Sequence, residues 1–157
     1  MIEAGSPFPD FSLVAHDGST ISSDGLEGTP FLVYFYPKAD TPGCTKEACS
    51  FRDSWAGVQM AGLRVFGVSY DKPETNRKFA EKYGLQFLLL SDRDKTLASA
   101  VGAKTILIPV PKRISYLVGA DGLVLKAFPK VDPSRHAAEV LSDLSAFGGR
   151  EETSPSD

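Results

Sequence analysis

Residues 31–49 read Phe-Leu-Val-Tyr-Phe-Tyr-Pro-Lys-Ala-Asp-Thr-Pro-Gly-Cys-Thr-Lys-Glu-Ala-Cys, and this stretch decides the fold. Its first part, Phe31–Tyr36, is a continuous apolar run typical of a buried strand, and Pro37 ends it. A helix is predicted over residues 42–61 because apolar residues then recur at helical spacing, at Ala48, Phe51, Trp55 and Val58. The stretch therefore predicts a buried strand that leads directly into a helix, with Cys44 in the first turn.

The rest of the chain continues this alternation of strands and helices. We expect an N-terminal hairpin over residues 10–24, strands at 64–69, 87–90, 114–118 and 123–128, and helices at 73–83, 94–101 and 133–147. The turn signal Asp121-Gly122 joins the last two strands. This order predicts an α/β protein with a thioredoxin-like fold, in which helices flank a central mixed β-sheet and the N-terminal β-hairpin is an extension. One domain is expected over residues 1–147, followed by a disordered polar tail over 148–157.

The composition excludes several classes of protein. The 157 residues carry a net charge of -3 with no run of Lys or Arg, which argues against a nucleic-acid partner. No apolar run approaches the roughly 18 residues that span a bilayer. Residues 1–7 lack the basic-then-apolar pattern of a signal peptide. We therefore expect a cytoplasmic protein with no membrane partner, and in a reducing cytosol two close cysteines suggest redox or metal chemistry.

The two cysteines, Cys44 and Cys49, occupy different turns of the predicted helix. With Pro42 in the first turn, Cys44 lies where unpaired backbone N–H groups and the helix dipole stabilise the reactive thiolate. In an intact helix, Cα atoms five residues apart are roughly 8–9 Å from each other, beyond the ~7 Å limit for a disulfide. A disulfide between these cysteines would therefore require the start of the helix to unwind.

Other interpretations of the cysteines are open on spacing alone. A buried free cysteine is often only a small apolar residue. An iron–sulfur site needs four cysteines, and this chain has two. A zinc site would need His16 or His136, which lie in unrelated segments and which we expect at the surface. The redox motif C-x-x-C is absent. We predict neither a metal nor a cofactor.

The motif Pro37-x-x-x-Thr41-x-x-Cys44 resembles the active-site motif of peroxiredoxins. The longer string over residues 36–53, YPKADTPGCTKEACSFRD, is similar to the peroxiredoxin Q branch, also called bacterioferritin comigratory protein. Residues 9–13 resemble the start of that family, and residues 112–117 resemble its arginine-bearing strand. The resemblance runs from about Glu3 to Phe147 and implies a thiol-dependent peroxidase for hydrogen peroxide and organic hydroperoxides.

The resemblance also implies a role for each matching residue. Cys44 would attack the peroxide and become a sulfenic acid, and Cys49 would condense with it to a disulfide that thioredoxin or a similar reductant reopens. Thr41 would hydrogen-bond at the thiolate and the peroxide, Arg113 would supply the cation that stabilises them, and Pro37 would shield the thiolate. The branch implies a monomer that needs no bound cofactor.

Taken without the resemblance, the supporting residues have simpler interpretations. Arg113 would be a solvated surface charge and Thr41 a plain helix cap. We expect the charged side chains of Glu47 and Arg52 to face solvent, although either could join the Arg113 network. Two other functions stay open: a general thiol–disulfide oxidoreductase, weakened by the missing C-x-x-C, and a non-catalytic binding module of thioredoxin fold.

Overall fold

A computed structural model describes the backbone of residues 1–152 and the side chains of residues 1–147. Seven strands form one mixed sheet in the order β2-β1-β5-β4-β3-β6-β7. The strands are β1 Ser12–Ala15, β2 Thr20–Ser22, β3 Phe31–Phe35, β4 Arg64–Ser69, β5 Leu88–Ser91, β6 Ser115–Val118 and β7 Val124–Phe128. The central strands β3, β4 and β5 are parallel to one another, and every other pair is antiparallel. The predicted thioredoxin-like α/β fold with an N-terminal hairpin is confirmed.

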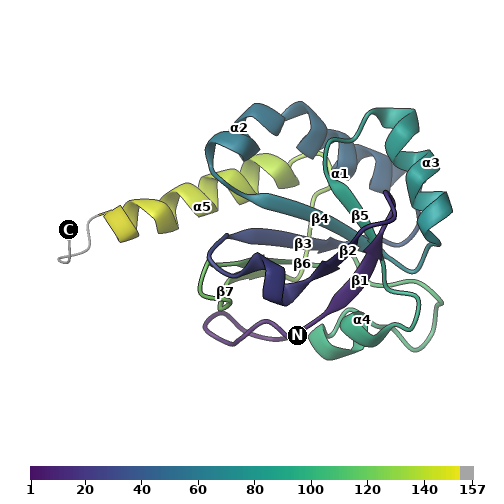
Figure 1. The fold of residues 1–157 in the computed structure, drawn as a ribbon, viewed down its shortest axis with the longest axis horizontal. Coiled ribbons are helices and arrows are strands. Elements are labelled where there is room, and N and C mark those ends of the chain that lie inside the picture. The colour runs from purple at the N-terminus through teal and green to yellow at the C-terminus, as the bar shows by residue number, and fades with distance from the viewer. Residues whose placement is uncertain (153–157) are drawn as a thin grey trace.

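The helices lie on both faces of this sheet (Figure 1). They are η1 Ser23–Leu26, α1 Pro42–Asp53, α2 Trp55–Met60, α3 Pro73–Tyr83, α4 Thr96–Val101 and α5 His136–Glu152. Figure 1 places α1, α2, α3 and α5 over one face and α4 over the other. Among the described residues, no helix combines the length and the apolar character needed to cross a membrane.

Strand β3 contributes to the apolar core on both faces of the sheet. All five of its residues are buried, and its side chains alternate between the two cores. Phe31, Val33 and Phe35 pack on the side of α4, while Leu32 and Tyr34 pack on the side of α1. This burial on both faces explains why the strand appears in the sequence as a continuous apolar run.

The helix predicted over residues 42–61 is wrong in one respect, because two helices occupy it. Helix α1 ends at Asp53, and Ser54, with φ -99° and ψ 13°, separates it from α2. Asp and Ser form hydrogen bonds that compete with helical backbone bonding, so an Asp-Ser pair is a weak point in a helix. Glycines in the left-handed conformation follow helices α2 and α3, with Gly62 at φ 67° and Gly84 at φ 63°.

Helix α5 differs from its predicted bounds at both ends. It begins at His136 and not at residue 133, because Asp132 accepts hydrogen bonds from the backbone and hydroxyl of Ser134 and so forms a turn first. It continues to Glu152, so residues 148–152 of the predicted tail are helical. Residues 153–157 lie outside the described residues, where the predicted disorder stays a prediction.

Candidate active site

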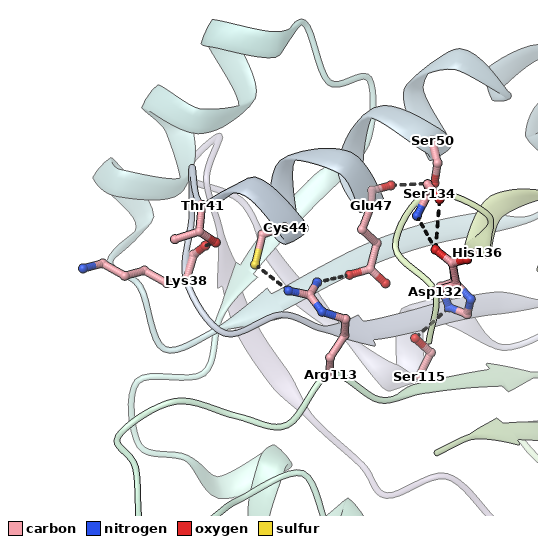
Figure 2. Close-up of polar contacts among 10 residues, drawn as sticks. All are labelled: Lys38, Thr41, Cys44, Glu47, Ser50, Arg113, Ser115, Asp132, Ser134 and His136. Atoms are coloured by element: carbon pink, nitrogen blue, oxygen red, sulfur yellow. Dashed lines mark hydrogen bonds and ion pairs between the residues drawn. The ribbon is translucent and has the colours of Figure 1, made fainter. Parts of the chain in front are cut away.

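Cys44 lies at the amino end of α1, just beyond the end of β3 (Figure 2). Helical hydrogen bonding begins with the Thr45 N–H, which donates to the Thr41 carbonyl at 2.8 Å. The N–H groups of Gly43 and Cys44 therefore precede the helical ladder and are available to stabilise an anion. The Cys44 thiol is free and its residue is only 1% exposed. The predicted position of this cysteine in the first turn is confirmed.

The guanidinium of Arg113 lies between Cys44 and Glu47 (Figure 2). Its Nη2 donates to Cys44 Sγ at 3.3 Å, and its Nη1 donates to Glu47 Oε1 at 2.7 Å. Gly43 makes room for this arrangement, since a Cβ at that position would lie 3.0 Å from Arg113 Nη2. One cation from the segment before β6 thus joins two side chains of α1.

Glu47 is a functional residue that sequence reasoning placed wrongly. We expected a solvent-facing charge, but its side chain is fully buried and paired with Arg113. Burial raises the pKa of the Glu47 carboxyl to about 7, against the opposing effect of the Arg113 charge and hydrogen bond. The second carboxyl oxygen, Oε2, is buried without a hydrogen-bond partner among the described residues. Its position three residues after Cys44, on the same helix face, is the signal that could have identified it.

Cys44 and Glu47 stabilise the protonated form of the Arg113 guanidinium. Burial acts to lower the pKa of Arg113, but its hydrogen bonds and charge interactions with Cys44 and Glu47 raise that pKa overall. The side chain is 21% exposed, so solvent screens the guanidinium only in part. It can therefore act as a fixed cation beside the sulfur.

Thr41 and Pro37 occupy the loop between β3 and α1. Thr41 is the N-cap residue of α1, but its hydroxyl does not cap the helix and donates instead to the Lys38 carbonyl at 2.7 Å. Pro37 is half-buried and lines a surface pocket of about 470 Å³ together with Pro109 and Val110. The structure thus places both residues in the loop that leads into the helix of Cys44.

Cys49 is half-buried in α1, and its thiol is also free. It shares the helix with Cys44, as the spacing predicts. Because the helix is continuous from Pro42 to Asp53, the geometry of a regular helix separates the two Cα atoms by roughly 8–9 Å. Arg52 does not join Arg113, and its Nη1 donates instead to the Tyr83 carbonyl.

His136 is the second residue whose predicted environment is wrong. We expected a surface histidine, but it is 1% exposed, with Nε2 2.8 Å from the Ser115 hydroxyl oxygen. Its ring packs edge-on against Phe51 of α1 and Phe128 of β7. Burial, with help from the Arg113 charge, lowers the pKa of His136 to about 4, so the imidazole is neutral at neutral pH. His136 therefore packs between α1 and β7, behind the Arg113 network.

The described side chains form no metal-binding site. Among residues 1–147, whose side chains are described, no group of three or more His, Cys, Asp or Glu could hold a metal ion. Absence of a cofactor stays a prediction of the sequence.

Comparison with known proteins gives one consistent family. The model of the AhpC/TSA family matches residues 4–127. A putative peroxiredoxin Bcp of Coxiella burnetii is 40% identical over 149 residues, which cover 91% of this chain and 99% of the relative. The peroxiredoxin Bcp of Escherichia coli is 41% identical, covering 91% of this chain and 96% of the relative.

Solved structures agree with the sequence relatives. The PrxQ structure of Xylella fastidiosa has a TM-score of 0.88 and 26% identity, covering 94% of this chain and 98% of that one. The BcpB structure of Mycobacterium tuberculosis, described as a peroxidoxin, has a TM-score of 0.86 and 31% identity, covering 94% and 99%. A bacterioferritin comigratory protein of Xanthomonas campestris, whose structure is described in terms of alkyl peroxide reduction, has a TM-score of 0.83 and 29% identity, covering 94% and 97%.

Proposed function

Since this chain belongs to the AhpC/TSA family and is a peroxiredoxin of the Bcp and Q type, we propose that Cys44 is the cysteine that reduces the peroxide. The observation that carries the assignment is the hydrogen bond from Arg113 Nη2 to Cys44 Sγ at the start of α1. Substrates are hydrogen peroxide and organic hydroperoxides, and electrons come from a thiol reductant.

The geometry suits the movement of charge in the first step. The Cys44 thiolate attacks the terminal peroxide oxygen, the O–O bond breaks, and the leaving oxygen takes a proton to become water or an alcohol. Cys44 is left as a sulfenic acid. Negative charge passes from sulfur to the leaving oxygen. The Arg113 guanidinium and the N–H groups of the first turn are already in place, so they can stabilise this charge without reorganising. We place Thr41 at the peroxide as a hydrogen-bonding residue, and Pro37 as a shield for the sulfur.

Glu47 acts in this scheme as a positioning residue. Its Oε1 fixes one side of the Arg113 guanidinium, so that the other side is presented to Cys44. Removal of one preorganised donor at an active site typically lowers the rate about 10²–10³-fold, so a misplaced guanidinium would be costly.

Cys49 completes the cycle as the resolving cysteine. Its sulfur attacks the sulfur of the Cys44 sulfenic acid, the S–S bond forms, the S–O bond breaks, and water leaves. Because the helix separates the two cysteines, this step requires α1 to unwind locally. A dithiol reductant, which we propose is thioredoxin or a similar protein, then returns two electrons and reopens the disulfide.

Peroxide consumption by three variants tests this function. With a thioredoxin system, we expect the unsubstituted chain to turn over and Cys44→Ser to be inactive. Cys49→Ser should consume one equivalent and stop as a sulfenic acid, which a dimedone adduct would reveal by mass. Equal turnover in all three proteins would refute the assignment of both cysteines. Catalytic reduction of insulin disulfides by the unsubstituted chain would favour a general thiol–disulfide oxidoreductase.

We also propose the domain organisation, the cellular compartment and the oligomeric state of the enzyme. A single sheet with an apolar core on each face supports one domain over residues 1–147. Two free cysteines that must be returned to the thiol state favour the reducing cytoplasm. We propose a monomer, which light scattering at catalytic concentration would check, with a dimer mass as the contrary result.

A further inference from the structure

Asp40, the residue before the N-cap of α1, has an unusual backbone conformation. Its φ is 59°, and among the described residues only one other non-glycine residue, Lys95, has a positive φ. This left-handed region is unfavourable for residues with a side chain, although Asp tolerates it better than most. Such a conformation persists where surrounding contacts hold it.

Two side chains at the end of α3 provide those contacts. Lys82 Nζ donates to Asp40 Oδ2 at 2.8 Å, and the Tyr83 hydroxyl donates to Asp40 Oδ1 at 2.8 Å. The Lys82 ammonium also lies over the Tyr83 ring, 5.3 Å from its centroid, and Phe79 packs edge-on against the same ring. Both carboxylate oxygens of Asp40 are thus bound by one corner of α3.

The other end of α1 is attached to the same corner. Arg52 Nη1 donates to the Tyr83 carbonyl at 2.9 Å, and Gln86 Nε2 donates to the Arg52 carbonyl at 3.2 Å. Helices α1 and α3 lie on the same face of the sheet (Figure 1). The segment from Cys44 to Cys49 is therefore held between two attachments to the end of α3.

The two attachments differ in strength. Near Arg52, the ring of Phe51 is fully buried and stacks on Tyr34 with centroids 5.3 Å apart, so the carboxyl half of α1 is fixed by the core. At the amino end, the Asp40–Lys82 pair is exposed, with side-chain exposures of 41% and 57%. Exposed polar contacts contribute little and break readily. Opening of the helix should therefore begin at Asp40.

We propose that Asp40 is a latch, a positioning residue whose bonds to Lys82 and Tyr83 hold the first turn of α1 closed and set the rate of disulfide formation. This inference rests on the two-cysteine cycle proposed above. Release of the latch frees the backbone around Thr41 and lets the turn that carries Cys44 unwind toward Cys49. Before oxidation the Arg113–Cys44 hydrogen bond also holds this turn closed, so loss of the latch should leave the peroxide step unchanged and affect the opening that follows oxidation.

Stopped-flow fluorescence of the single tryptophan, Trp55, can separate the two steps, because Trp55 begins α2 and only Ser54 separates it from the end of α1. Asp40→Gly removes both bonds and permits the left-handed conformation without strain. Tyr83→Phe removes only the hydroxyl and keeps the ring packing. Arg77→Gln is the matched control, since it removes an exposed charge of α3 that pairs with Glu81 and not with α1.

We expect the peroxide-dependent phase to be unchanged in all variants. The second, peroxide-independent phase should be about three- to tenfold faster in Asp40→Gly, and less so in Tyr83→Phe, as the loss of weak surface hydrogen bonds implies. In excess peroxide, both variants should accumulate less Cys44 sulfinic acid, measured by mass, because faster resolution competes with further oxidation. Arg77→Gln should match the unsubstituted protein in both readouts.

A second phase that is unchanged in both Asp40→Gly and Tyr83→Phe would overturn the latch. A global loss of stability would give a different result. It would lower the thermal midpoint and change the first kinetic phase in both Tyr83→Phe and Asp40→Gly. Peptide mapping of the oxidised wild-type chain distinguishes the two proposals. If it shows no Cys44–Cys49 disulfide, the proposed cycle fails and the latch with it, whereas equal rates of disulfide formation in all variants refute the latch alone.

Discussion

Replacement of Glu47 by glutamine should make the stability of the protein less dependent on pH. Glutamine keeps an oxygen acceptor for Arg113 but cannot ionise. In the folded protein the pKa of Glu47 is raised from 4.5 to about 7 by burial. The folded state therefore holds this proton where the unfolded chain has lost it. The contribution of Glu47 to stability is complete below pH 4.5 and is lost as the pH rises through 7.

The size of the effect follows from the two pKa values. Between pH 5 and pH 8, a shift from 4.5 to about 7 lowers the free energy of unfolding by about 2.5 kcal/mol, as an order of magnitude. Urea denaturation at the two pH values should show this loss in the unsubstituted protein and not in Glu47→Gln, once the changes common to both are subtracted. Glu81→Gln, which removes an exposed carboxylate, sets the baseline for that subtraction.

Parallel behaviour of the two proteins would refute the reasoning. If Glu47→Gln and the unsubstituted chain lost equal stability between pH 5 and pH 8, the Glu47 carboxylate would be ionised throughout. The Arg113 charge would then outweigh burial, and Glu47 would be a fixed anion.

Three further substitutions test the site. Arg113→Gln should lower the second-order rate constant with peroxide about 10²–10³-fold in stopped-flow measurements, and an effect no larger than that of Arg77→Gln would exclude Arg113 from the chemistry. Gly43→Ala should slow the same step about tenfold, because the new methyl group would lie 3.0 Å from Arg113 Nη2 and displace the guanidinium. Circular dichroism should show that the fold is unchanged, and a rate constant equal to that of the unsubstituted protein would show that the guanidinium moves freely. Tyr34→Phe should raise the free energy of unfolding by about 1 kcal/mol in urea, because it removes a buried hydroxyl that has no hydrogen-bond partner among the described residues, and a destabilised variant would indicate a bound water there.

Much of the fold could be predicted because local patterns reflect it directly. Strand β3 reveals its burial through an unbroken apolar run, and Pro37 marks its end. The place of Cys44 follows from Pro42 at the first helical position. These features depend on neighbours in sequence, so the sequence contains the information needed to find them. The helix break at Ser54 was missed because apolar spacing continues across it.

The buried polar residues could not be predicted for a physical reason. A charge faces solvent in most helices, and only a partner from elsewhere makes its burial tolerable. The partner of Glu47 is Arg113, 66 residues away, and His136 pairs with Ser115, 21 residues away. For His136 no neighbour within one turn indicates the pairing, and for Glu47 the one local signal is its position three residues after Cys44. Pairings of this kind come from the sheet, which brings the start of β6 beside α1.

In the proposed cycle, α1 must satisfy two opposed requirements, and the Arg113 network offers a way to order them in time. The first turn must be folded for Cys44 to receive the Arg113 hydrogen bond, yet Glu47 lies inside the segment that must unwind to reach Cys49. Conversion of a thiolate to a sulfenic acid removes the negative charge on sulfur, and a charge-assisted hydrogen bond is roughly twice as strong as a neutral one. The peroxide step would therefore weaken one of the contacts that holds the turn closed. Opening would then follow oxidation and not precede it.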